Sequence, residues 1–121
     1  MLLRTSSRIY GEALILDCNG RIVFGEETAL LRQQVLEMLT QTGAVVLNLS
    51  NVSFIDSSGV GELIRLLTTA SRDRKKIVLA GLTGRVRDVL QITKLASCFE
   101  TYSTPIEAAE SVSAEAAGDN N

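Results

Sequence analysis

A short apolar run in the middle of the chain, residues 44–49, constrains the fold more than any other feature. Every residue in it except Asn48 is apolar. The run is too short for a buried helix, and such a stretch is typical of a parallel strand covered on both faces. A second buried run follows at residues 76–81. Because parallel strands need long crossover connections, usually helices, these runs predict a layered α/β fold.

The segments around these runs complete an alternating order of strands and helices. We expect strands over residues 8–10, 13–18, 44–49, 76–81 and 98–102, with Asn19-Gly20 closing the second strand and residues 50–59 forming a loop. We expect helices from Glu26 to Gly43, from Val60 to Arg72, from a Thr83 cap through Leu90, and from a Thr104 cap onward. The resulting order, β-β-α-β-α-β-α-β-α, predicts a mixed, mainly parallel sheet of about five strands with four helices. The helices are expected mostly on one face of the sheet.

The composition favours a binding module over an enzyme. None of the 121 residues is a histidine, which removes the commonest general base and most zinc sites. Cys18 and Cys98 are far apart, and each lies in a strand-like stretch. We interpret both as small buried residues in a reducing compartment. We therefore expect no metal and no cofactor.

The charge and hydropathy patterns indicate a cytoplasmic protein. The net charge is −2, whereas a surface that follows a phosphate backbone normally needs a basic excess, so we expect no direct contact with nucleic acid. No apolar run approaches the roughly 18 residues of a membrane span. The first eight residues also lack the apolar core of a signal peptide.

The segment Asp56-Ser57-Ser58-Gly59-Val60-Gly61 carries the chemistry of interest. It precedes an amphipathic helix, so its hydroxyls lie beside free backbone N–H groups, a setting that suits an anion. A purely structural interpretation is also available, because Asp and Ser are preferred helix caps and glycine eases a tight turn. Local chemistry alone leaves both interpretations open.

The sequence here resembles a known family. Val45-Val46-Leu47-Asn48-Leu49, followed by Phe54-Ile55-Asp56-Ser57-Ser58-Gly59-Val60-Gly61, is similar to the signature of the STAS domain (sulphate transporter and anti-sigma factor antagonist). The turn Asn19-Gly20-Arg21 and the stretch 84–90 fit the same family. The resemblance covers residues 4–112, which we take as the domain. Residues 113–121 are expected to form a frayed or disordered tail.

The resemblance implies an anti-sigma factor antagonist that works by partner switching and so regulates bacterial transcription. In the family, a partner kinase phosphorylates the serine directly after the aspartate, which here is Ser57. Asp56 is then its acidic neighbour, and Ser58 and Gly59 complete the partner-binding loop. The unphosphorylated protein would bind a serine kinase that is also an anti-sigma factor. A serine phosphatase would reverse the modification.

One departure from the family concerns the stretch after Gly20. Many antagonists carry an acidic residue soon after this glycine, whereas here no acid occurs before Glu26. If that acid helps to engage the kinase, the partner surface of this protein differs. Residues 22–24, Ile-Val-Phe, would form either an exposed apolar contact patch or a packed edge strand.

Other functions compete with this interpretation. A stressosome component or a lipid-transport accessory subunit would share the fold, and fold alone does not fix function. A nucleotide-binding enzyme is more remote, because Ile64 stands where a GxGxxG run starting at Gly59 needs its third glycine. The sequence leaves open whether the protein is a monomer or a homodimer.

Overall fold

The sheet has five strands that lie in chain order. In the computed structural model, which describes residues 1–118, these are β1 (Leu3–Tyr10), β2 (Ala13–Ile22), β3 (Ala44–Ile55), β4 (Lys76–Ala80) and β5 (Thr101–Tyr102). β1 pairs with β2 antiparallel, and all other neighbours are parallel. This confirms the predicted mixed, mainly parallel sheet.

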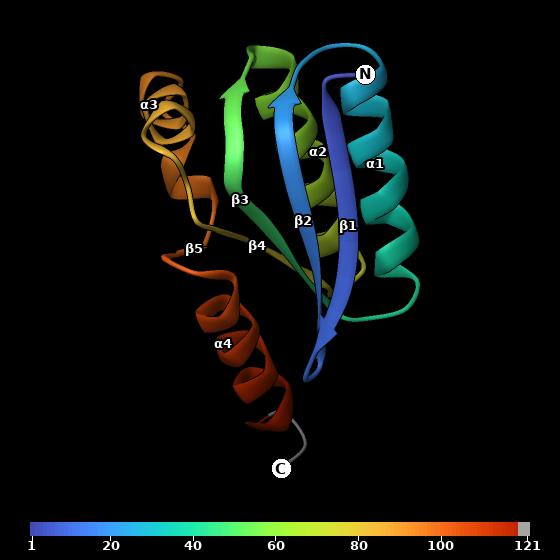
Figure 1. The fold of residues 1–121 in the computed structure, drawn as a ribbon. Helices are drawn as coiled ribbons and strands as arrows, with labels where there is room; N and C mark the ends of the chain where they lie inside the picture. Colours follow the sequence, from blue (N-terminus) through green and yellow to red (C-terminus); the bar gives the residue numbers. More distant parts are fainter. Residues whose placement is uncertain (119–121) are drawn as a thin grey trace.

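Three helices cover one face of the sheet and the fourth covers the other. The helices are α1 (Glu26–Leu39), α2 (Ser57–Arg72), α3 (Gly84–Ile92) and α4 (Pro105–Gly118). Figure 1 shows α4 across the sheet from α1 and α2. Leu47 packs in the core beneath α1–α3, whereas its neighbour Val46 packs beneath α4. The apolar run 44–49 is therefore continuous because β3 is buried on both faces. No helix within residues 1–118 is both long enough and apolar enough to cross a membrane.

β2 and β3 are both longer than the sequence predicted. β2 continues through Asn19-Gly20 to Ile22, and β3 continues to Ile55 where we expected a loop from residue 50. The extensions pair with each other, but two register shifts interrupt the ladder and break the alternation that marks a strand. Gly20 has a φ of 115°, and a Cβ there would overlap the carbonyl oxygen of Leu2. The glycine that we took as a strand end instead allows close approach within the strand.

Other expectations at element ends were also wrong: β1 begins at Leu3, before the predicted residue 8, and α2 begins at Ser57, before the predicted Val60. α1 ends at Leu39, before Gly43, and Thr40 is its C-cap. The strand expected over residues 98–102 shortens to Thr101–Tyr102, and Cys98 lies in a preceding 3₁₀ turn, where it is exposed. Phe99, the residue that follows this turn, is buried. Cys18, by contrast, is buried in β2 as predicted.

α4 extends further than expected. Its predicted Thr104 cap is confirmed, because the Thr104 hydroxyl accepts a hydrogen bond of 3.1 Å from the Glu107 amide. The helix then continues past residue 113, where we expected fraying, to Gly118. Ser113 accepts a 3.0 Å hydrogen bond from the amide of Glu12, which fixes this part of the helix against the first hairpin. Residues 119–121 of the expected tail lie outside the described residues.

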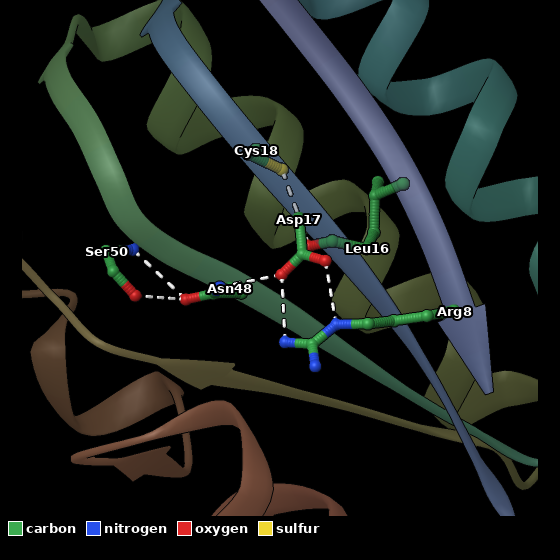
Figure 2. A network of polar contacts seen from close by, with 6 residues as sticks. All are labelled: Arg8, Leu16, Asp17, Cys18, Asn48 and Ser50. Carbon is green, nitrogen blue, oxygen red and sulfur yellow. Dashed lines mark hydrogen bonds and ion pairs between the residues drawn. The ribbon is translucent and has the colours of Figure 1, made fainter. Parts of the chain in front are cut away.

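A polar network on the α4 face of the sheet satisfies the one polar residue of the buried run. Figure 2 shows Asp17 between Arg8 and Asn48. The Arg8 Nε donates to Asp17 Oδ2 over 2.8 Å, and the Asn48 side-chain amide donates to Asp17 Oδ1 over 2.7 Å. The Asn48 side-chain oxygen accepts from the backbone amide of Ser50 over 3.2 Å. The network thus connects β1, β2 and β3.

This network predicts an acid-dependent contribution to stability. Burial of Asp17 by itself would raise the pKa of its carboxyl, but the hydrogen bonds from Arg8 and Asn48 outweigh that effect and lower it. A carboxyl whose pKa is lower in the folded state than in the unfolded state stabilises the fold at pH values above the unfolded-state pKa, roughly 3.9. This contribution is lost as the pH falls through the folded-state pKa. We expect Asp17→Asn to lower stability by about 1 kcal/mol at pH 7 and by progressively less below pH ~4.

Urea unfolding from pH 7 to pH 2.5 measures the difference between the two proteins. Asp88→Asn, at an exposed position on α3, serves as the matched control and should differ little from wild type. A constant difference between wild type and Asp17→Asn across this range would contradict the role assigned to the network.

Candidate functional site

Asp56 caps α2 and joins two loops through its carboxylate. Its backbone is extended, and Oδ1 accepts a 2.8 Å hydrogen bond from the amide of Gly59. Oδ2 accepts a 3.1 Å hydrogen bond from the amide of Phe24, in the connection between β2 and α1. The Asp56 amide donates to the carbonyl oxygen of Ile22 over 3.2 Å. The aspartate therefore acts as a helix cap, and it also fixes the start of α2 against the end of β2.

Gly59 allows α2 to approach the sheet closely. It is buried, and a Cβ at this position would lie 2.5 Å from the carbonyl oxygen of Ile22 and 2.6 Å from Cγ1 of Ile55. Neither the backbone oxygen nor the buried isoleucine can move away at low cost. Glycine is needed here for packing, in addition to any role in a partner-binding loop.

Ser57 and Ser58 begin α2, and both are exposed. The first amides of a helix have no partner within the helix, so the local dipole favours a negative charge at this position. The structure thus places Asp56, Ser57, Ser58 and Gly59 together in one helical turn. Asp56 and Gly59 face the fold, whereas the two serines face solvent.

The sequence did not predict an ion pair that lies beside this turn. Glu62 lies one turn further along α2 and is only 1% exposed. Its Oε1 lies 2.7 Å from the guanidinium of Arg32 on α1 and 3.6 Å from that of Arg65. Its Oε2 is buried without a hydrogen-bond partner among the described residues. The only signal in the sequence was a glutamate beside the apolar stripe of the helix, and nothing local indicated its partner on α1.

Residues 22–24 were expected to form either an exposed apolar patch or a packed edge strand, and each interpretation holds for only part of the stretch. Ile22 is fully buried at the end of β2, so an exposed patch that includes it was wrong. Phe24 is 78% exposed, and its amide is the one held by Asp56. The exposed surface beside the Asp56 cap therefore presents an aromatic ring.

The two glycines of α2 offer a matched test of the close approach. We expect Gly59→Ala to destabilise the fold by about 1–3 kcal/mol, because the new methyl group meets Ile22 and Ile55. Gly61→Ala places its methyl group in open space and should stabilise the helix by about 0.5–1 kcal/mol. The melting temperatures of both variants, compared with wild type, measure these changes in stability. Equal melting temperatures would show that α2 does not depend on a glycine at position 59.

The chain is similar in sequence to a protein of known function. The anti-sigma-B factor antagonist of Staphylococcus aureus (strain NCTC 8325 / PS 47) is 31% identical over 65 residues, which are 52% of this chain and 60% of that protein. The match therefore spans less than two thirds of the length of this relative.

Several solved structures are similar in fold. A Thermotoga maritima protein assigned as an anti-sigma factor antagonist has a TM-score of 0.80 at 26% identity, covering 89% of this chain and 93% of that one. The anti-sigma factor antagonist SpoIIAA of Bacillus, in its unphosphorylated form, has a TM-score of 0.75 at 20% identity, covering 90% of this chain and 96% of that one. SpoIIAA has also been solved in a phosphorylated form. Residues 4–108 match the STAS domain, and the chain belongs to this family.

Proposed function

We propose that this protein is an anti-sigma factor antagonist switched by phosphorylation of Ser57. In this proposal, the unphosphorylated protein binds a cytoplasmic serine kinase that is also an anti-sigma factor. It thereby frees the sigma factor for transcription. Phosphorylation ends the binding, and a serine phosphatase restores it. The protein acts by binding and catalyses no reaction itself.

The observation that carries this proposal is the division of roles within one helical turn. The carboxylate of Asp56 is occupied by the amides of Gly59 and Phe24, and Gly59 is packed against the sheet. The hydroxyl of Ser57 is exposed beside them. A kinase can therefore reach Ser57 without unfolding the turn. The existence of a phosphorylated form of SpoIIAA, which shares the fold, adds support.

The consequences of phosphorylation follow from its charge. A phosphoserine carries about −1.5 to −2 charges at neutral pH. In the free protein this charge lies at a helix N-terminus, which favours anions, so the fold tolerates it. In a complex the same group must be desolvated against the partner beside the carboxylate of Asp56. A loss of about 3–4 kcal/mol of binding energy would weaken affinity by two to three orders of magnitude.

The position of the modification can be mapped directly. We expect the cognate kinase and ATP to place phosphate on Ser57 and not on Ser58. Both hydroxyls are exposed, so the choice rests on the resemblance to the family. Mass spectrometry of wild type, Ser57→Ala and Ser58→Ala distinguishes the two serines. Full labelling of Ser57→Ala would contradict the assignment.

The effect on binding is a separate prediction. We expect phosphorylated wild type to bind the kinase 100- to 1000-fold more weakly than wild type. Ser57→Asp should bind with intermediate affinity, because aspartate carries one charge and is smaller than phosphate. Ser57→Ala should bind like wild type but stay bound when ATP is added. Calorimetric titration measures these affinities. Equal affinities for wild type, its phosphorylated form and Ser57→Asp would show that Ser57 does not control binding.

A further inference from the structure

Two arginines stack on one aromatic ring at the carboxyl end of β2 and β3. The guanidinium carbon of Arg21 lies 4.9 Å from the centre of the Phe54 ring, and that of Arg85 lies 6.0 Å from it. Arg21 is the register partner of Phe54 across the β2–β3 pair. Arg85 comes from the first turn of α3, whose cap Thr83 donates to the carbonyl oxygen of Val52 on β3 over 3.0 Å. Three separate elements therefore contribute to the stack.

The positive charge of this stack is not neutralised within the part of the chain that the structure describes. Within the described residues neither Arg21 nor Arg85 forms an ion pair, and both residues are exposed. The carboxylate of Asp56 accepts hydrogen bonds from two backbone amides, and that of Asp17 is engaged by Arg8 and Asn48. Asp88 lies one turn after Arg85 on α3 and does not pair with it. Two guanidinium groups thus remain free to bind an anion.

The stack adjoins the turn that carries Ser57. Phe54 precedes Asp56 by two residues, and the residue after Arg21, Ile22, accepts the hydrogen bond of the Asp56 amide. Figure 1 shows the end of β3, the start of α2 and the end of β2 at the same end of the sheet. The exposed ring of Phe24 lies in the next connection. A partner that covers the Ser57 turn would therefore bind at the same end of the sheet as this stack.

We propose that Arg21, Phe54 and Arg85 form a binding surface for a carboxylate-rich segment of the partner protein. This inference rests on the proposed function, and it names a chemical feature of the partner. A guanidinium stacked on a ring keeps its edge N–H groups available for bidentate contact with a carboxylate. The ring also limits the entropy lost on binding, because it already restricts the arginine side chains. The net charge of −2 argues against a nucleic acid as the occupant.

The surface can be tested first with a defined probe. Amide and arginine side-chain NMR signals are followed while a ten-residue oligoglutamate peptide is added to the full chain at low salt. We expect shifts centred on Arg21, Phe54 and Arg85. Arg21→Gln and Arg85→Gln should each weaken binding of the peptide about three- to fivefold. Arg72→Gln, with the same charge change at the far end of α2, should weaken it less than twofold. Shifts elsewhere, equal effects of all three variants, or tighter binding of a ten-nucleotide thymidine strand would overturn the proposal.

The same variants against the cognate kinase separate this inference from the proposed function. Weaker kinase binding by Arg21→Gln and Arg85→Gln, but not by Arg72→Gln, would support both. If the kinase binds all three variants like wild type while Ser57→Asp binds weakly, the arginine surface is wrong and the switch stands. If wild type does not bind the kinase but the arginines still select the acidic peptide, the proposed function is wrong and the acidic-ligand surface stands.

Discussion

The carboxylate of Asp56 determines the geometry of the whole site. Its two oxygens accept hydrogen bonds from the amides of Gly59 and Phe24, so one side chain fixes the first turn of α2 and the connection into α1. A negative charge at a helix N-terminus is also favoured by the helix dipole. The close approach of Gly59 to Ile22 and Ile55 completes the arrangement. Because these inward groups are all occupied, the hydroxyl of Ser57 needs no structural partner and remains at the surface.

The two-sided burial of β3 made the fold class predictable from the sequence. Alternate residues such as Val46 and Leu47 serve different cores, so the run 44–49 shows no amphipathic alternation and indicates a central parallel strand. The strand ends could not be predicted in the same way. Beyond residue 49 the β2–β3 ladder contains two register shifts, and Gly20 adopts a positive φ within a strand. Turns and β-bulges contain the same types of residue, so only the pairing of the strands shows which of the two a segment forms.

The candidate site was predictable only where its chemistry is local. Asp56, Ser57, Ser58 and Gly59 are consecutive, and the capping of the Gly59 amide by Asp56 depends on spacing alone. The ion pair of Arg32 with Glu62 joins residues that are 30 positions apart. The stacking of Arg21 and Arg85 on Phe54 also depends on how β2, β3 and α3 meet. Such contacts follow from strand register and helix placement, and no single-residue pattern in the sequence encodes them.

This separation of inward and outward groups explains how a charge can be added without unfolding the domain. In the proposed switch, a phosphate on Ser57 would leave the hydrogen bonds of Asp56 and the packing of Gly59 in place, and the helix N-terminus would offset part of its charge. The free energy of the proposed switch would then come from the complex, where the phosphate and Asp56 would be desolvated together. Arg21 and Arg85 would oppose this effect, because their positive charge at the same end of the sheet attracts negative charge. If both proposals hold, the partner's carboxylates and the phosphate on Ser57 would respond to the same local electrostatic field, so partner choice and phosphorylation would be coupled.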